Sequence, residues 1–453
     1  MNDHVPHHVP GPLNQGDSLL THADVGPYHG APGLVGGFIV RQLLERGQPA
    51  ESIRIVDLRA PEWADADRST AAGRVDFVRA DISSAEATAR AFAKPWPGSA
   101  AGLPLTVFHT AAVIVPADRS RRLAGVCEAV NVRGTRNVVA AARRAGADVL
   151  VATTSASISI RPVELWVPPW RLWSAASPRG YWQVQDERDF FEPLRGRAAF
   201  YANYPASKAE AERAVCAANS PAMRTGCIRP ANGVYGDPTD NTVGGALAWR
   251  LHHHPSLSRA HAPTRRWTSH IVQNFVHGIN AAVAHLDLEA VLAAAGSETR
   301  AQAGRPFVVT DPNPPVRYGD VYRLLRALSG SGFRALALPP VLVLLLAYPV
   351  EWYVVARARW PALRRVLPPP PGLVKHLQPG IFSICTHLVA SDGAAARPVG
   401  EGGLGGMAQE VVEWNRDRRD ARGGAPPRSY KTSVSLADDI ARAAALVESV
   451  TGG

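Results

Sequence analysis

The sequence predicts an α/β fold built on a doubly wound parallel sheet, with a smaller C-terminal substrate-binding part and a membrane-leaning helix. Short apolar segments at residues 52–57, 75–81, 105–112, 148–155 and 225–230 alternate with stretches of helical periodicity. A glycine-rich turn opens the first helical stretch, and Tyr204 and Lys208 lie together in a later one. Strands that alternate with helices form a parallel sheet, and ligands bind at the carboxyl ends of its strands.

The composition is that of a folded protein, and the length of 453 residues allows two or three domains. Hydrophobic residues make up 46% and charged residues 19% of the chain, which excludes a disordered protein. We expect a disordered tail at residues 1–24 and a dinucleotide-binding domain at 25–238 with a Trp-rich insertion at 160–200. Residues 239–420 are expected to bind substrate and membrane, with strand 306–311 returning to the sheet, and 421–453 to form a mobile extension with a helix.

The net charge of +10 comes mainly from arginine, and the arginines are scattered along the chain. Scattered charge argues against nucleic acid as a partner and favours an anionic cofactor or a membrane surface. The four cysteines show no C-x-x-C spacing and no histidine at a metal-ligand distance in the sequence, so no metal site is expected. Few cysteines favour a reduced intracellular setting.

A glycine-rich turn precedes the helix expected at residues 37–47. Gly30, Gly33 and Gly36 form the pattern G-x-x-G-x-x-G, which lets the backbone approach a pyrophosphate at the start of a helix. A strand should lead directly into Gly30. The nearest apolar run, residues 18–21, lies too far back for a tight turn, so either the first strand is irregular or the N-terminal sequence is not the native one.

Three acidic or small positions complete the expected cofactor site. Asp57 ends a short strand about 20 residues after the glycines, where a carboxylate can hold the adenosine ribose hydroxyls. A carboxylate there repels a 2′-phosphate, which favours NAD over NADP, although Arg59 nearby works in the other direction. Asp81 ends the next expected strand and is placed for an adenine contact, and Ala111 permits close approach of the cofactor.

Tyr204 and Lys208 are the strongest candidates for catalysis. Residues four apart lie on one face of a helix, and an ammonium one turn from a phenol lowers the phenol pKa from its usual value near 10. The phenol can then act as a general base toward an alcohol or as an acid toward a ketone. The alternative is a surface pair on an ordinary helix. Ser155 falls at the carboxyl end of a strand, where it is either a substrate contact or a capping serine.

Two regions depart from simple strand and helix alternation. Tryptophans and prolines at residues 160–200 indicate an insertion that either forms an apolar wall over the site or only packs onto the core. Residues 335–356 are the most apolar, but Pro349 and Glu351 interrupt them, and Trp352 and later arginines suit a membrane interface. We favour peripheral or re-entrant insertion over a buried helix or a full span. Helices are also expected within residues 267–286 and at 318–328.

Taken together, the chain resembles the extended short-chain dehydrogenases of the Rossmann fold. It is most similar to the 3β-hydroxysteroid dehydrogenase/isomerase and sterol-4α-carboxylate 3-dehydrogenase family, including fungal members with a Trp-rich insertion. The matching positions are the three glycines, Asp57, Asp81, residues 109–112, 130–135, 153–155 and 204–208, and the triplet at 228–230. The chain departs from the family pattern at the missing first strand, at His29 in place of Thr, and at Thr154 where Ser is frequent.

The resemblance implies a role for each matching residue. Tyr204 is the acid/base, Lys208 binds the nicotinamide ribose and lowers the Tyr204 pKa, and Ser155 orients the substrate oxygen. Asn131 holds a water for proton relay. The resemblance also implies that Pro230 lies against the cofactor, together with the glycines, Asp57, Asp81 and Ala111.

The function we expect is NAD-dependent oxidation of a 3β-hydroxyl group on a sterol, steroid or triterpenoid at the cytoplasmic face of the endoplasmic reticulum membrane. NADP is the less favoured cofactor, and a homodimer is allowed. One alternative is a dehydrogenase or ketoreductase of secondary metabolism with a terpenoid or polyketide substrate. Another is a non-catalytic nucleotide-binding protein on the same fold. The joint presence of Ser155, Tyr204 and Lys208 argues against the last alternative.

Overall fold

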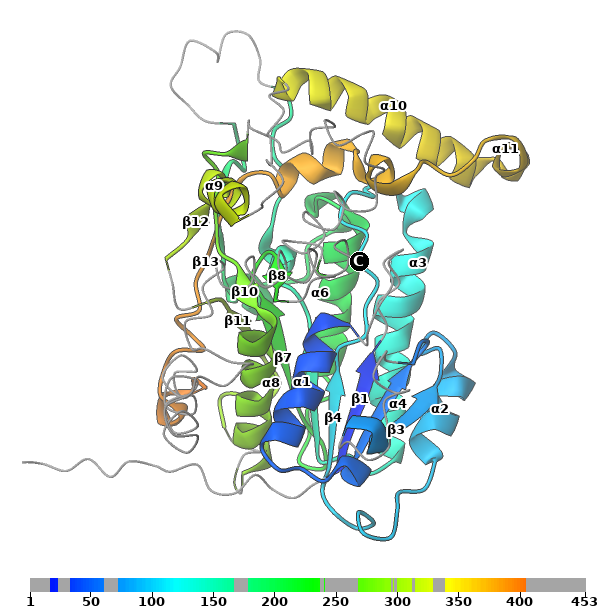
Figure 1. Cartoon of the computed structure of the whole chain (residues 1–453), viewed down its shortest axis with the longest axis vertical. Helices are drawn as coiled ribbons and strands as arrows, with labels where there is room; N and C mark the ends of the chain where they lie inside the picture. The colour runs from blue at the N-terminus through cyan, green and yellow to red at the C-terminus, as the bar shows by residue number, and fades with distance from the viewer. Residues whose placement is uncertain are drawn as a thin grey trace, which may run out of the picture.

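Seven parallel strands form the central sheet of the computed structural model (Figure 1). The structure describes residues 17–22, 33–60, 72–166, 178–236, 240, 268–294, 296, 300–311, 314–328 and 339–404. The strand order within these residues is β11-β7-β5-β4-β1-β2-β3. The bounds are β1 Asp17–His22, β2 Ile53–Asp57, β3 Asp76–Arg79, β4 Leu105–His109, β5 Val149–Thr153, β7 Arg224–Pro230 and β11 Pro306–Val309.

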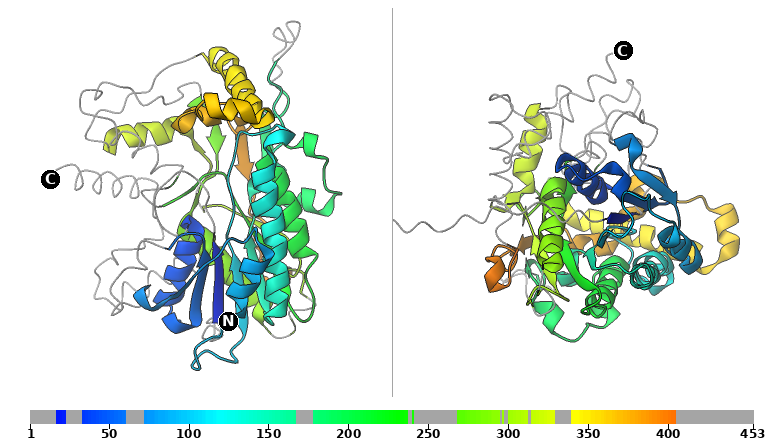
Figure 2. Two further views of the ribbon diagram at one scale, coloured as in Figure 1. Left: turned by 90° about the vertical axis from the view of Figure 1, so that its right-hand side faces the viewer. Right: turned by 90° about the horizontal axis from the view of Figure 1, so that it is seen from below.

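Two layers of helices cover the sheet, as the views in Figure 2 show. One layer contains α1 (Leu34–Glu45) and α8 (Gly278–Ala293), and the other contains α2 (Ala85–Ala93), α4 (Thr135–Arg144) and α6 (Asn203–Cys216). Side chains alternate along each strand, so Val149 and Val151 of β5 join the core under the first layer, and Leu150 and Ala152 join the core under the second. The predicted α/β class is therefore confirmed.

The strand order places a topological switch point between β1 and β4. The chain proceeds from β1 to β2 and β3 on one side and then crosses to β4, β5 and β7 on the other. In open parallel sheets of this kind, ligands bind outside the carboxyl ends of the strands at such a point. The carboxyl ends of β1, β2, β4, β5 and β7 are therefore where the site is expected.

The expectation of a missing first strand is wrong. Residues 17–22 form β1 at the centre of the sheet, where Leu20 pairs with Ile55 of β2 and with Phe108 of β4. These residues also lie within the range that the sequence assigned to a disordered tail. The requirement for a tight turn before Gly30 caused the error, because residues 23–32, which lie outside the described part, separate β1 from Gly33.

The helix expected within residues 267–286 begins later than predicted. Val272 belongs to β9 (Val272–Gln273) and Val276 to β10 (Val276–His277), and α8 starts at Gly278. Strand β9 pairs with β12 (Val316–Arg317), and β10 pairs with β8 (Val234–Tyr235). These short pairings use β-branched residues, which fit the pleated surface of a sheet better than a helix.

A smaller mixed sheet joins the insertion to the C-terminal part. Its strand order is β12-β9-β13-β6, with β6 at Trp182–Gln185 and β13 at His387–Ala390. The ring of Trp182 stacks on His387 with centroids 3.7 Å apart. Trp166 and Trp182 are exposed, while Trp170 and Trp173 lie outside the described residues. The described part of the insertion is thus paired with the C-terminal part.

The apolar segment forms one continuous helix, α10 (Pro340–Arg359), which runs through Pro349 and is followed by α11 (Pro361–Val366). Figure 1 shows α10 lying across one end of the molecule. Arg119, in the loop that follows β4, forms an ion pair with Glu351 of α10 at 2.6 Å. This contact places α10 at the carboxyl end of the sheet. The expected helix at 318–328 is confirmed as α9 (Tyr318–Leu328).

The remaining short helices are turns between these elements. They are α3 Gly125–Cys127, a π-helical turn Glu128–Gly134, α5 Arg188–Phe191, and 3₁₀ turns at Ala50–Ser52, Ala72–Arg74, Arg121–Leu123, Ala156–Ser159, Arg197–Ala199, Gly372–His376, Pro379–Ser383 and Val399–Glu401. The helices expected at residues 407–416 and 435–450 lie outside the described residues.

Candidate active site

Tyr204 and Lys208 lie in the first two turns of α6 and are both buried, with 8% and 4% of their surface exposed. The low exposure excludes a surface pair. The start of α6 is fixed by Asn203, whose backbone N–H donates to the Asp118 carbonyl at 2.7 Å and whose side chain donates to the Ser120 carbonyl at 2.8 Å. Tyr204 shares a buried apolar cluster with Val113 and Cys127. The loop after β4 therefore positions the tyrosine.

Lys208 is anchored to the carboxyl end of β5. Its Nζ donates to the Thr153 carbonyl oxygen at 2.9 Å. The Thr153 hydroxyl lies 2.7 Å from Nε2 of His285, whose Nδ1 lies 2.7 Å from the Ala281 carbonyl. A carbonyl only accepts, so Nδ1 carries the proton and Nε2 accepts from Thr153. Burial, together with the nearby Lys208 ammonium, lowers the His285 pKa to about 4, which keeps this imidazole neutral at physiological pH.

Ser155 follows β5 by two residues and is half-buried. Its Oγ accepts from the Ser157 backbone N–H at 3.2 Å and donates to the Ser157 hydroxyl at 2.8 Å. The serine thus caps the 3₁₀ turn Ala156–Ser159. A capping serine was one of the two roles that the sequence allowed for Ser155, the other being a substrate contact. The hydroxyl has one hydrogen, so it can donate to a ligand only by turning away from the Ser157 hydroxyl. Such a rotation leaves its oxygen free to keep accepting from the Ser157 backbone N–H.

Asn131 is fully buried in the π-helical turn Glu128–Gly134, and its side chain bonds two other segments. Its Oδ1 accepts from the Val113 backbone N–H at 2.8 Å, and its Nδ2 donates to the Val113 carbonyl at 3.0 Å and to the Ser207 hydroxyl at 2.9 Å. Single π-helical turns inside helices are frequent at functional sites. Since both Nδ2 hydrogens are engaged, a water held by the Asn131 side chain would have to donate to Oδ1.

The cofactor residues predicted near the switch point are only partly described. Gly33 precedes α1 and Gly36 is buried in its first turn, while Gly30 lies outside the described residues. Asp57 is the last residue of β2, is 4% exposed, and accepts from the Arg59 backbone N–H at 3.0 Å. Arg59 therefore contacts this carboxylate through its backbone.

The other three predicted contacts follow three different strands. Ala111 is buried just after β4, and Pro230 is buried at the end of β7. Asp81 is exposed after β3, where its Oδ1 accepts from the Ser83 backbone N–H at 2.8 Å. All three lie at the carboxyl edge of the sheet. Asp81 forms a turn through this bond, and its adenine contact stays a prediction.

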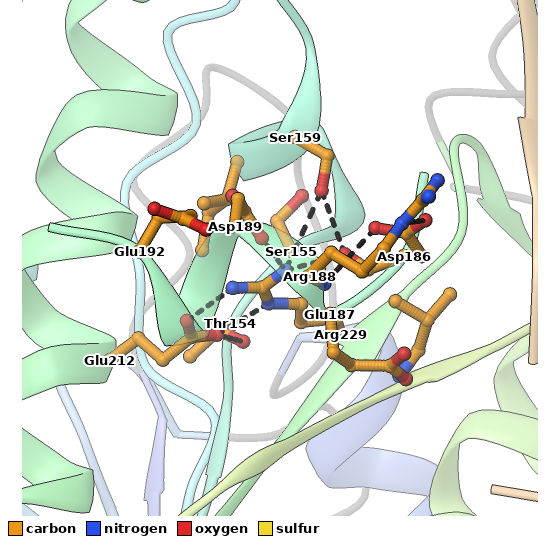
Figure 3. A network of polar contacts seen from close by, with 12 residues as sticks. Thr154, Ser155, Ser159, Asp186, Glu187, Arg188, Asp189, Glu192, Glu212 and Arg229 are labelled. Atoms are coloured by element: carbon orange, nitrogen blue, oxygen red, sulfur yellow. Dashed lines mark hydrogen bonds and ion pairs between the residues drawn. The ribbon is translucent and has the colours of Figure 1, made fainter. Parts of the chain in front are cut away.

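A buried polar network that was not predicted from the sequence lies behind these residues (Figure 3). Arg229 of β7 donates to both carboxylate oxygens of Glu212 of α6, at 2.8 and 2.6 Å, and to Asp189 at 2.7 Å. Thr154 donates to Glu212 at 2.8 Å. One local signal was present, since Glu212 lies one helical turn after Lys208. Its arginine partner is a long-range contact that periodicity does not reveal.

The arrangement fits a nicotinamide dinucleotide. A buried carboxylate stands at the end of β2, small residues occupy the start of α1 and the end of β4, and a buried ammonium lies at the end of β5. These are the groups that a ribose, a pyrophosphate and a second ribose require. The sheet order and the Ser155, Tyr204 and Lys208 positions define an α/β protein of the extended short-chain dehydrogenase type.

The chain belongs to the 3-beta hydroxysteroid dehydrogenase/isomerase family, because the model of that family matches residues 28–162 and 186–337. It is 28% identical over 213 residues to human 3 beta-hydroxysteroid dehydrogenase type 7, a match that covers 46% of this chain and 49% of the relative. It is 25% identical over 330 residues to the Arabidopsis thaliana 3beta-hydroxysteroid-dehydrogenase/decarboxylase isoform 2, covering 70% of this chain and 50% of the relative. The chain thus spans about half the length of the curated relatives it matches.

Among solved structures, the terminal R domain of the myxalamid biosynthetic pathway is similar in fold. The TM-score is 0.50 at 18% sequence identity, and the match covers 98% of this chain and 92% of the other. At this identity the likeness concerns the fold alone.

Proposed function

We propose that the protein is an NAD-dependent dehydrogenase that oxidises a secondary alcohol on a bulky apolar substrate, in the first instance a 3β-hydroxyl group of a sterol, steroid or triterpenoid. The observation that carries the proposal is the buried Tyr204 and Lys208 pair, with Lys208 fixed to the Thr153 carbonyl two residues before Ser155. A non-catalytic nucleotide-binding protein has no need of a buried phenol and ammonium together with a hydroxyl at this edge of the sheet. Membership of the family supports the choice of a hydroxysteroid-like substrate.

The residues have separate tasks in this proposal. Ser155 donates a hydrogen bond to the substrate oxygen and holds the carbinol carbon in place. Tyr204 accepts the hydroxyl proton as its general base, which contributes typically about 10²- to 10⁴-fold to the rate. The Lys208 ammonium stabilises the phenolate of Tyr204 and so favours ionisation near neutral pH. Asn131 holds the loop at Val113 and the Ser207 hydroxyl, which keeps the tyrosine turn of α6 in register.

The cofactor in this proposal is NAD. When bound, its nicotinamide ring accepts the hydride. Asp57 would hold the adenosine ribose hydroxyls, and its carboxylate disfavours a 2′-phosphate, which makes NADP the weaker ligand. Gly30, Gly33 and Gly36 would admit the pyrophosphate, and Lys208 would bind the nicotinamide ribose. Asp81, Ala111 and Pro230 would line the remaining contacts.

We also propose that helix α10 rests on a membrane surface, at the cytoplasmic face of the endoplasmic reticulum. By length and composition alone α10 could cross a membrane. Its exposed apolar side chains are Val341, Leu342, Leu345, Leu346 and Trp352. Four arginines stand at the end of α10 and in α11, at positions 357, 359, 364 and 365. Exposed apolar groups beside cations suit the interface of an anionic bilayer, and Val343, Leu344 and Ala347 pack instead against Phe382 of the protein.

The test is NADH formation by the detergent-solubilised protein with NAD⁺ and a 3β-hydroxysterol, with and without a 4α-carboxylate. NADP⁺ and Tyr204→Phe serve as controls. We expect turnover with NAD⁺ and a loss of about 10²-fold or more in Tyr204→Phe. Full activity of the Phe variant would refute the catalytic assignment. NADH binding without turnover of any sterol would instead favour an alcohol of secondary metabolism, and a lack of both would refute the dehydrogenase proposal.

A further inference from the structure

The ion pair between Arg229 and Glu212 is fully buried and lies next to the residues of the candidate active site. Both side chains are 1% exposed. Arg229 donates through Nε and Nη2 to the two carboxylate oxygens of Glu212, the bidentate geometry that fixes a guanidinium and a carboxylate most rigidly. A buried ion pair of this kind is on average no more stabilising than apolar residues of similar volume. Its presence therefore calls for a reason other than stability.

Each group of the pair touches a different part of the site (Figure 3). Glu212 lies one turn beyond Lys208 on α6, and its Oε2 accepts from the Thr154 hydroxyl. Thr154 lies between Thr153, whose carbonyl holds Lys208, and Ser155. The remaining nitrogen of Arg229, Nη1, donates to the Asp186 carbonyl at 2.8 Å and to the Asp189 carboxylate at 2.7 Å.

We propose that Arg229 and Glu212 are positioning residues that set the end of β5, with Ser155, against the helix that carries Tyr204 and Lys208. The same pair holds the segment that follows β6, so the sheet that joins the insertion to the C-terminal part keeps its place relative to that helix. Neither residue contacts substrate in this proposal. The proposal rests on the dehydrogenase function above.

Loss of the pair should displace Ser155 relative to Tyr204 and Lys208. Displacement of reacting groups by about 1 Å can cost about 10²-fold in rate even when the altered residue lies away from the chemistry. Loss of the pair should lower kcat with little effect on KM, because the groups that bind the apolar body of the substrate are not changed. A displaced Lys208 should also raise the Tyr204 pKa and move the kcat profile toward higher pH.

The experiment compares Arg229→Met, the paired variant Arg229→Met/Glu212→Leu, and Thr154→Val with the full-length wild type. Arg229→Met leaves a buried carboxylate without its partner and should lower Tm. The paired variant should recover most of that Tm, since buried ion pairs are replaceable by apolar residues. We expect its kcat to remain at least tenfold below wild type, with its kcat profile shifted to higher pH. Thr154→Val, which removes one buried hydroxyl, should lower kcat about threefold to tenfold, with a smaller loss of Tm than Arg229→Met.

Arg54→Met is the matched control. Arg54 is also 1% exposed and ion-paired, with Asp76 at 2.6 Å, but it lies at the opposite end of the sheet near the start of β3. Its loss should lower Tm and leave kcat per folded enzyme unchanged. Recovery of both Tm and kcat in the paired variant, or wild-type kcat in Thr154→Val, would overturn the proposal.

A second readout separates this inference from the proposed function. Tyrosinate absorbance near 295 nm, compared with the Tyr204→Phe protein, reports the ionisation of Tyr204 without any substrate. A higher Tyr204 pKa in the paired variant than in the wild type supports the positioning role even if no alcohol is turned over. An unchanged Tyr204 pKa contradicts it even if the wild type is an active dehydrogenase.

Discussion

The side-chain nitrogen of Asn131 donates to the hydroxyl of Ser207 across 2.9 Å. This contact joins the π-helical turn to α6, the helix that carries Tyr204 and Lys208. Ser207 in turn donates to the Tyr204 carbonyl at 2.7 Å. Asn131 also holds both backbone groups of Val113, which belongs to the same buried apolar cluster as Tyr204. One amide therefore fixes both Ser207, on the tyrosine's own helix, and Val113, in the tyrosine's apolar cluster.

The first prediction concerns this amide. Asn131→Ala should destabilise the protein by about 1–3 kcal/mol, since it leaves buried backbone groups without partners, and should lower kcat more than it raises KM. Urea unfolding and steady-state kinetics measure the two effects. Asn137→Ala is the control, because Asn137 lies in the adjoining helix α4 and its side chain donates to the Ile82 carbonyl, away from Val113 and Ser207. Equal kcat values in the two variants would contradict a role in positioning Tyr204.

The second prediction concerns the ammonium near the phenol. Lys208→Met should lower kcat by about 10²-fold near neutral pH, and the loss should shrink as pH rises, because Tyr204 then ionises without help from the ammonium. The pH profile of NADH formation measures this change. Lys94→Met serves as the control, since Lys94 is half-exposed and paired with Asp76 outside the site. A deficit that is constant across pH would argue against phenolate stabilisation.

The third prediction follows from His285. Its folded pKa of about 4 lies below the usual 6.5, so the unfolded chain takes up a proton that the folded protein does not. Stability should therefore fall as pH drops from about 6.5 toward 4, by at most about 3 kcal/mol from this group. His285→Gln should flatten that part of the curve of unfolding free energy against pH. Parallel curves for the variant and the wild type would contradict the neutral buried imidazole.

The fourth prediction tests the membrane surface. Vesicles of phosphatidylcholine with added phosphatidylserine should sediment the wild-type protein better than phosphatidylcholine alone. Replacing Leu345 and Leu346 with Ser should weaken binding to both kinds of vesicle, because apolar burial supplies affinity. Replacing Arg364 and Arg365 with Gln should weaken only the added binding to anionic vesicles. Unchanged sedimentation in the Ser variant would refute docking through α10.

Local patterns in the sequence predicted most of the fold and the centre of the site. Apolar alternation revealed six of the seven strands of the main sheet, and the spacing of Tyr204 and Lys208 revealed the turn that carries them. Strand β1 was not predicted, because a strand was expected to end directly before Gly30 and residues 17–22 lie farther back. Val272 and Val276 were assigned to a helix because short apolar runs do not distinguish strand from helix by periodicity.

Contacts made by tertiary structure could not be predicted. The Thr153 carbonyl has no sequence signature, yet it receives the Lys208 ammonium. His285 lies 132 positions from Thr153, and only the packing of α8 against β5 brings them together. Glu212 and Arg229 have ordinary local surroundings in the sequence. They meet only because β7 lies beside β5 and α6 packs against β7.

The central position of β1 has a practical consequence for anyone who shortens the chain. A recombinant version that starts at residue 25 would remove the strand between β2 and β4 and expose two backbone edges in the middle of the sheet. Unpaired edges recruit strands from other molecules and promote aggregation. An insoluble product from such a truncation would therefore say nothing about the dehydrogenase itself.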